Sequence, residues 1–293
     1  MRNLIIRAAS GILFVVLLVG CIVSHPYAYA LLFAVITGLT TWEFCSIVNK
    51  NAGLQVNRFI STASAVYFFC AMLTYNVGMM GSDVFIPYLI SIMYLLISEL
   101  YFDRKENISN WAFALMSQLY VALPFSLLNT LSFIAVPDNS GFGVPQIIYN
   151  YWYPLSLFIF LWSSDTGAYC FGSLLGKHRL FPRISPKKSW EGSIGGAVVA
   201  LAASQIIATY IPFTPGLSEQ LSRLAWCGLA LCTVVFGTWG DLVESLLKRR
   251  LGIKDSGNII PGHGGMLDRF DSSLMAIPMA VVYLYTIMRI LQN

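Results

Sequence analysis

Residues Leu224–Leu247 read LAWCGLALCTVVFGTWGDLVESLL, and this run decides the fold class. A bilayer core of about 30 Å is crossed by about 20 apolar residues in a helix that rises about 1.5 Å per residue. The run is long enough to cross, and its charged residues, Asp241 and Glu244, both fall near its end. It therefore predicts a transmembrane helix that carries two acids close to one membrane face.

Other apolar runs of similar length are spread along the whole chain. They are Leu4–Val23, Ala28–Val48, Phe59–Tyr75, Val84–Leu100, Trp111–Phe133, Trp152–Leu175, Ile194–Ile211 and Ser273–Leu291. Of the 293 residues, 57% are hydrophobic and 11% are charged, whereas roughly 25% are charged in a typical soluble domain. So few polar residues do not cover the core of a soluble protein of this size. We expect an all-α fold, a polytopic transmembrane helical bundle of about nine spans.

The basic residues indicate which loops face the cytosol, because short cytosolic loops are enriched in Lys and Arg. With the N-terminus cytosolic and the C-terminus outside, 16 of the 18 basic residues lie in cytosolic segments, and Arg223 and Arg289 lie outside. The 16 are Arg2, Arg7, Lys50, Arg58, Arg104, Lys105, Lys177, Arg179, Arg183, Lys187, Lys188, Lys248, Arg249, Arg250, Lys254 and Arg269. The net charge of +4 is therefore mainly a topology signal, and no nucleic-acid partner is expected. We expect a multi-pass protein of the cell (inner) membrane with its site facing the cytosol.

The chain changes character near residue 150. Residues 1–150 are predicted to form N-terminal transmembrane helices, about five spans with short loops. Residues 151–293 are predicted to form a C-terminal catalytic region of about four spans with cytosolic loops, because most polar residues within spans lie there. In the first part, Glu43 lies near the cytosolic end of its span. The pattern leaves open whether Glu43 makes a helix-packing hydrogen bond or has a function.

Acidic residues gather at the ends of two neighbouring spans in the second part. One helical face, at positions i, i+3, i+4 and i+7, carries Asp241, Glu244, Ser245 and Lys248. Asp268 and Asp271 open the next span, and Asp165 lies within the run Trp152–Leu175. A carboxylate within a span costs at least about 2.5 kcal/mol, so a functional site is the default hypothesis. Clustered carboxylate oxygens near water indicate Mg²⁺ or a similar cation.

Two cytosolic loops add positive charge and glycine beside these acids. The first, Ser185–Gly192, reads SPKKSWEG, and the second contains GHGG at 262–265. Glycine lets the backbone approach an anion and offer its amides, and Lys and Arg attract phosphates. His263 is placed to contact a phosphate or to carry a proton. Metal-binding acids beside a phosphate-binding surface are typical of phosphoryl or nucleotidyl transfer.

The spacing of these polar residues resembles a family signature. The pattern is Ser245-x-x-Lys248-Arg249-x4-Lys254-Asp255, then Pro261-x-His263-Gly264-Gly265-x-x-Asp268-Arg269-x-Asp271. It resembles the signature of the CDP-diacylglycerol synthases, also called phosphatidate cytidylyltransferases. SDTGAY at 164–169 and SPKKSWEG at 185–192 resemble two further blocks of that family, with Ser189 where Thr is expected in many relatives.

The resemblance implies an enzyme, a nucleotidyltransferase of phospholipid biosynthesis that makes CDP-diacylglycerol and pyrophosphate from CTP and phosphatidic acid. It implies dependence on Mg²⁺, with K⁺ as the candidate for a second cation, and assembly as a homodimer. The metal ligands it implies are Asp241 and Asp268, followed by Asp271 and Asp165. The predicted catalytic residues are Asp241, Asp268, His263 and Lys248. The residues predicted to bind substrate are Lys187, Lys188, Ser245, Arg249, Lys254, Gly264, Gly265 and Arg269.

Two other functions share some of these features. A CTP-dependent lipid kinase of the polyprenol or phytol type has a similar membrane architecture and the same nucleotide, but the complete signature favours the synthase. An ion-coupled transporter also carries acids within the membrane, yet it places them near mid-membrane in two related halves. Here the acids cluster towards one face. Labelled CTP separates the first two functions, because the synthase puts cytidine on lipid and the kinase only phosphate.

Overall fold

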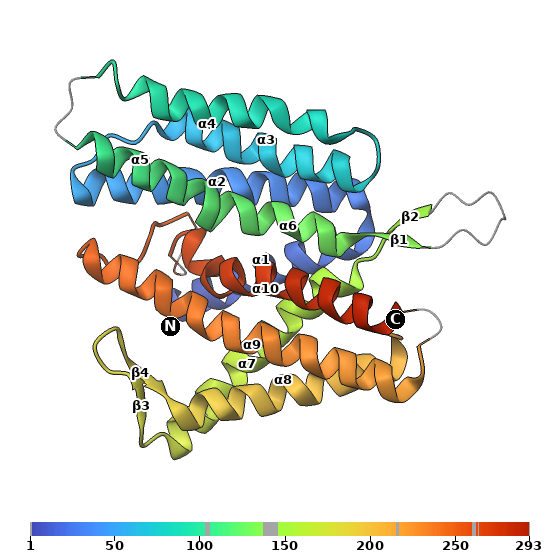
Figure 1. Cartoon of the computed structure of the whole chain (residues 1–293). Helices are drawn as coiled ribbons and strands as arrows, with labels where there is room; N and C mark the ends of the chain where they lie inside the picture. Colours follow the sequence, from blue (N-terminus) through green and yellow to red (C-terminus); the bar gives the residue numbers. More distant parts are fainter. Residues whose placement is uncertain are drawn as a thin grey trace. The chain divides into compact units, whose positions relative to one another are not determined.

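The computed structural model describes residues 2–102, 106–136, 146–214, 217–259, 262 and 264–292, and only the backbone of residues 2–8 and 291–292 (Figure 1). Most of the chain is helical, as the composition predicts. Contacts divide it into two compact units. The first unit is Met1–Tyr151 with Arg250–Phe270, and the second unit is Trp152–Arg249 with Asp271–Asn293. The functional division into residues 1–150 and 151–293 stays a prediction.

The first unit is a group of antiparallel helices followed by a small hairpin. Its helical elements are α1 (Arg2–Ser24), α2 (Pro26–Ala52), α3 (Arg58–Asn76), η1 (Ser82–Phe85), α4 (Ile86–Ser98), α5 (Asn107–Met116), η2 (Ser117–Ala122) and α6 (Leu123–Ser132). The element η2 is a π-helical turn that joins α5 to α6. Strands β1 (Phe133–Val136) and β2 (Gln146–Tyr149) pair antiparallel. Helix α3 packs against both α2 and α6.

Local sequence sets the ends of the helix that carries Glu43. Helix α2 begins at Pro26, which is favourable in a first turn, and the His25 side chain accepts a hydrogen bond from the Tyr27 amide at 3.3 Å. The helix ends before Gly53, whose φ of 68° is left-handed. Phe44, beside Glu43, is fully buried. Glu43 itself is also buried, so the last turns of α2 point its side chain into the interior of the first unit.

The second unit contains the remaining helices and a second hairpin. Its elements are α7 (Trp152–Leu175), β3 (Arg179–Phe181), β4 (Ser185–Ser189), α8 (Trp190–Tyr210), α9 (Glu219–Arg250) and α10 (Leu267–Gln292). Helix α10 starts in the first unit and continues in the second from Asp271. Helices α7 and α8 pack along their lengths, and the antiparallel hairpin β3–β4 connects them (Figure 1). The Ser189 hydroxyl caps the N-terminus of α8, where it accepts a hydrogen bond from the Gly192 amide at 3.2 Å.

The helices have the length and surface of membrane spans. Among the described residues, six helices are long and apolar enough to cross a bilayer, and two shorter apolar helices are Ala9–Ser24 and Ser82–Ser98. Their outer faces expose large apolar side chains such as Leu13, Leu31 and Ile194. A multi-pass helical membrane protein is thus confirmed. All nine ranges predicted as spans overlap helices, although Val84–Leu100, Trp111–Phe133 and Ile194–Ile211 end one or two residues beyond them. Helix α7 is not among the six. The number of nine spans and the orientation stay predictions.

Candidate active site

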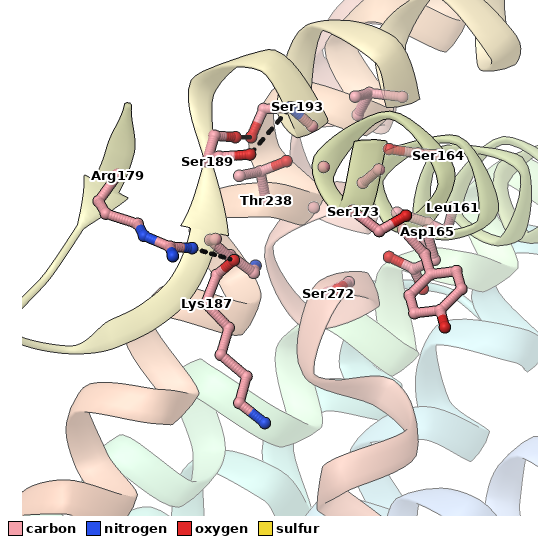
Figure 2. A pocket seen from close by; sticks show the side chains of 17 residues that line it. Leu161, Ser164, Asp165, Ser173, Arg179, Lys187, Ser189, Ser193, Thr238 and Ser272 are labelled. Atoms are coloured by element: carbon pink, nitrogen blue, oxygen red, sulfur yellow. Dashed lines mark hydrogen bonds between the residues drawn. The ribbon is translucent and has the colours of Figure 1, made fainter. Parts of the chain in front are cut away.

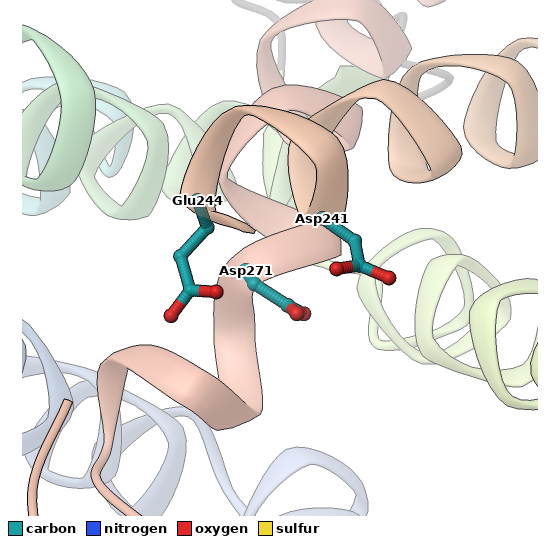
Figure 3. Close-up of side chains that lie close together, drawn as sticks. All are labelled: Asp241, Glu244 and Asp271. Atoms are coloured by element: carbon teal, nitrogen blue, oxygen red, sulfur yellow. The ribbon is translucent and has the colours of Figure 1, made fainter. Parts of the chain in front are cut away.

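Three carboxylates of the second unit lie close together. Asp241 and Glu244 come from α9, Asp271 comes from α10, and one carboxylate oxygen of each lies within 4.8 Å of the others (Figure 3). Glu244 is fully buried, and the other two are half-buried. The helices approach closely because residue 240 is glycine: a Cβ there would lie 2.6 Å from the Asp271 carbonyl oxygen. We call Asp241, Glu244 and Asp271 the acid cluster.

Two lysines face the acid cluster. Lys188, on β4, forms an ion pair with Asp241. Lys248, one helical turn after Glu244, places its Nζ 2.5 Å from Glu244 Oε2. Carboxylates this close repel one another unless positive charge is nearby. The ammonium groups of Lys188 and Lys248 therefore offset the repulsion between the carboxylates of the acid cluster.

Further groups act on single members of the acid cluster. The Ser245 hydroxyl donates a hydrogen bond to Asp241 Oδ1 at 3.1 Å. The Ser272 amide donates to Asp271 Oδ1 at 2.6 Å. Asp271 also experiences the negative charges of Asp241 and Asp165 and the positive charge of Lys248. Asp165, from α7, is thus electrostatically linked to the cluster.

A cavity of about 460 Å³ opens beside these residues within the second unit (Figure 2). Helix α7 contributes Ser164, Asp165 and Ser173, the hairpin contributes Arg179, Lys187, Lys188 and Ser189, and α9 and α10 contribute Thr238 and Ser272. The wall therefore carries hydroxyl groups and three basic side chains beside apolar residues such as Leu161 and Val234. The hairpin is fixed locally, because Arg179 donates to the Lys187 carbonyl at 3.3 Å. Glu191 also accepts the amides of Lys177 and His178, each at 3.2 Å.

Asp268 makes its described contacts in the first unit. Its Oδ2 atom accepts hydrogen bonds from the Ser256 amide and the Gly265 amide, each at 2.8 Å, and lies 2.9 Å from the Ser256 hydroxyl. Gly264 precedes this contact with a φ of 82°, which only glycine adopts readily, and a Cβ there would lie 2.5 Å from Asp268 Oδ2. The carboxylate thus fixes the loop that ends at α10.

Comparisons with known proteins decide the family. The model of the cytidylyltransferase family matches residues 5–287. The chain belongs to the cytidylyltransferase family. A phosphatidate cytidylyltransferase of Staphylococcus saprophyticus is 33% identical over 275 residues, which cover 93% of this chain and 94% of that protein. One from Staphylococcus haemolyticus is 36% identical over 75% of this chain and 77% of its own. One from Staphylococcus aureus is 34% identical over 79% of this chain and 82% of its own.

Most residues predicted for the site of this cytidylyltransferase are described. Asp241 and Asp271 lie together in the acid cluster, Lys188, Lys248 and Ser245 contact it, and Lys187 and Asp165 line the cavity. In the first-unit loop or next to it, Arg249, Lys254 and Arg269 are exposed, Gly264 is half-buried and Gly265 is buried. His263 lies outside the described residues. The individual roles of all these residues stay predictions.

Sequence reasoning assigned no role to Glu244, which completes the acid cluster. The sequence does contain a pattern that could have indicated Glu244, because it shares a helical face with Asp241 three residues earlier and Lys248 four residues later. Sequence reasoning also did not connect Ser256 with Glu43, because the two residues are 213 positions apart.

Proposed function

We propose that this protein is a phosphatidate cytidylyltransferase, which transfers the cytidylyl group of CTP to phosphatidic acid and releases pyrophosphate. The observation that carries the proposal is the acid cluster, with carboxylate oxygens within 4.8 Å, in a member of the cytidylyltransferase family. The relatives named phosphatidate cytidylyltransferase, which match most of this chain, support the same lipid substrate. The products would be CDP-diacylglycerol and pyrophosphate.

The acid cluster fits a magnesium ion by its chemistry. Magnesium prefers oxygen ligands, and carboxylates are its usual protein ligands. Asp241 and Asp271, with Glu244, would hold it, and Asp165 and Asp268 remain predicted as further ligands. A bound ion would neutralise phosphate charge and would stabilise the departing pyrophosphate. A second cation, K⁺, stays part of the proposal.

The basic wall of the cavity fits the triphosphate of CTP. A cavity of about 460 Å³ lies within the range of roughly 300–1,000 Å³ that small-molecule sites occupy. Arg179 and Lys187 line it, and Lys188 lines it while pairing with Asp241. We assign these side chains to the phosphates, since Lys and Arg give strong charge-assisted contacts to phosphate oxygens. Lys248, Arg249, Lys254 and Arg269 are proposed to assist, together with the backbone of Gly264 and Gly265.

The reaction needs no strong general base, because the phosphate of phosphatidic acid is already an anion near neutral pH. One of its oxygens attacks the α-phosphorus of CTP and forms the new P–O bond. The bond from the α-phosphorus to the bridging oxygen breaks, and the electron pair leaves with pyrophosphate. The protein's task is to hold two anions in line, which the lysines do by reducing repulsion. No covalent intermediate on His263 is required.

Labelled CTP tests the activity against the kinase alternative. Purified protein is incubated with phosphatidic acid, Mg²⁺ and CTP that carries ³H in cytidine and ³²P in the γ-phosphate. The synthase puts ³H on lipid and releases ³²P as pyrophosphate. A CTP-dependent lipid kinase would put ³²P and no ³H on lipid. A parallel incubation offers polyprenol or phytol as the acceptor, and ³²P without ³H on either would show a kinase in place of the proposed function. Lack of both labels on any lipid would contradict both enzymes.

We also propose the membrane arrangement on which this site depends. The chain would cross the cell membrane about nine times with the N-terminus and the site on the cytosolic side, and it would form a homodimer. A single cysteine between Lys177 and Lys188 should react with an impermeant maleimide only from the cytosolic side. One between Thr214 and Glu219 should react only from outside. Reaction of both from one side would refute the nine-span arrangement, and cross-linking in the membrane measures the dimer.

A further inference from the structure

Glu43 is a buried acid to which the proposed reaction gives no role. It lies on α2 with 5% of its surface exposed. The Ser256 hydroxyl donates a hydrogen bond to Glu43 Oε1, and the Met266 amide donates to Glu43 Oε2 at 2.7 Å. These partners are 213 and 223 residues away in the sequence. Both belong to residues 251–259, 262 and 264–266, which we call the signature loop because they carry much of the family-like pattern.

The signature loop encloses the Glu43 carboxylate closely. A Cβ at Gly257 would lie 3.0 Å from Glu43 Cδ, and a Cβ at Gly265 would overlap the carboxylate itself. Two glycines thus let the backbone of the loop approach from both sides. This close approach explains why glycines stand at these two loop positions.

Ser256 connects Glu43 to Asp268. The same hydroxyl that donates to Glu43 lies 2.9 Å from Asp268 Oδ2, and the Ser256 amide lies 2.8 Å from that atom. Gly265 donates to Asp268, and the next residue, Met266, donates to Glu43. Glu43 and Asp268 therefore both bind the signature loop at Ser256 and again at the neighbouring residues Gly265 and Met266.

These contacts decide between the two readings that the sequence leaves open for Glu43. A carboxylate in an apolar helix is costly and needs compensating donors. A helix-packing role would take them from side chains of a neighbouring helix, but Ser256 and Met266 belong to the signature loop, and the further backbone donor, Leu267, directly follows it as the first residue of α10. We infer that Glu43 is a positioning residue: through Ser256 and Met266 it fixes the signature loop and the orientation of Asp268. The inference rests on the proposed function, because the loop matters only if it serves the reaction.

Activity measurements on Glu43→Gln form the first test, since Gln keeps the size and loses the charge. Loss of a hydrogen bond to a charged group predicts a fall in kcat of roughly ten- to hundredfold, with a smaller change in the KM for CTP. Ser256→Ala should give a similar fall. The double variant should be little worse than either single one, because both changes break one network. Glu99→Gln is the matched control: Glu99 is also a buried acid of the first unit, and Asn110 donates to it at 2.9 Å.

Hydrogen exchange measured by mass spectrometry tests the positioning without relying on turnover. In Glu43→Gln, peptides that contain Ser256 and Met266 should exchange faster, whereas peptides from α7 and α8 should keep their wild-type rates. Glu99→Gln should leave the signature loop unchanged. The wild-type protein is also assayed for synthesis of CDP-diacylglycerol. If it makes none, the proposed function is refuted, and this result is distinct from a failure of the positioning role of Glu43.

If the wild-type protein is active, any one of three results would overturn the inference. One is wild-type kcat in Glu43→Gln, whatever the exchange shows. The second is faster exchange throughout both units, which indicates general destabilisation. The third is a lower kcat with an unchanged signature loop, which would place the effect of Glu43 elsewhere.

Discussion

Two groups of acids occupy the ends of apolar helices in this protein, and they are stabilised differently. In the second unit, Asp241 and Glu244 face the ammonium groups of Lys188 and Lys248. In the first unit, Glu43 and Asp268 accept hydrogen bonds from the neutral groups of Ser256, Gly265 and Met266. Both arrangements keep carboxylates in an apolar surrounding.

The difference distinguishes a site that binds metal and phosphate from a group of acids that holds a loop in place. A carboxylate that faces a movable lysine can exchange that cation for a metal ion or give up the lysine to a phosphate. A carboxylate held by backbone amides and a serine is fixed in place, and it fixes the backbone in return. We therefore expect changes in the acid cluster to affect metal dependence strongly, and changes at Glu43 to affect the position of the signature loop.

Removal of the metal should have the largest effect. Excess EDTA is expected to reduce synthesis of CDP-diacylglycerol to background, because the acid cluster and the triphosphate then repel each other. Added Mg²⁺ should restore it. Pyrophosphate release and labelled lipid measure the activity, and Ca²⁺ at equal concentration serves as the control for charge alone. Turnover that persists in excess EDTA would contradict a metal-dependent cluster.

Asp241→Asn should have the next largest effect. Asn keeps the size but removes the charge that faces Lys188, and loss of a group that organises transition-state charge costs roughly a hundred- to a thousandfold in kcat. Asp271→Asn should behave alike and also raise the Mg²⁺ concentration at half-maximal rate. Glu219→Gln is the matched control, because Glu219 is an exposed acid on the same helix that pairs with Arg223. If Asp241→Asn kept most of its activity, the assignment of this residue to the metal would be wrong.

The helices were predictable from the sequence, and the small hairpins were not. The apolar run Trp152–Leu175 gives a helix, α7, with the same bounds, because a long apolar run predicts a buried helix, although α7 is not among the six helices with the length and hydropathy of a span. Strands β3 and β4 have three and five residues with mostly charged or polar side chains, so they carry no alternating pattern. The helix α10 begins at Leu267, six residues before the apolar run Ser273–Leu291 starts, because its first turns contain the polar residues of the site.

The candidate site was predictable where its residues share a helix. Helical spacing places Asp241 and Ser245 on one face, and the structure joins them by a hydrogen bond. The position of Asp271 beside Asp241 agrees with the acids that the sequence places at the ends of two neighbouring spans, whereas Asp268, three residues earlier, is not part of the acid cluster. The link from Glu43 to Ser256 was not predictable, because no local pattern encodes a contact between residues 213 positions apart. The ion pair of Lys188 with Asp241 depends on tertiary structure in the same way.

Lys248→Met should lower stability as well as activity. Lys248 Nζ lies 2.5 Å from the fully buried Glu244, and removal of one partner of a buried ion pair costs about 3–5 kcal/mol. The melting temperature in detergent should fall, and kcat should fall about ten- to hundredfold. The double variant with Glu244→Gln should regain the melting temperature but not the activity. A single variant as stable as the wild type would show that the ion pair does not hold the acid cluster together.

Ser245→Ala should have the smallest effect and therefore measures how finely Asp241 is oriented. The Ser245 hydroxyl donates to Asp241 Oδ1 at 3.1 Å, and one such hydrogen bond contributes about 0.5–1.5 kcal/mol, which corresponds to roughly two- to tenfold in rate. The fall should appear in kcat and in the Mg²⁺ concentration at half-maximal rate, because Asp241 is proposed to hold the metal. Ser245→Thr keeps the hydroxyl and should recover most of the rate. A loss confined to the KM for CTP would instead make Ser245 a direct nucleotide contact, as the family resemblance implies, and the orientation of Asp241 would then rest on Lys188.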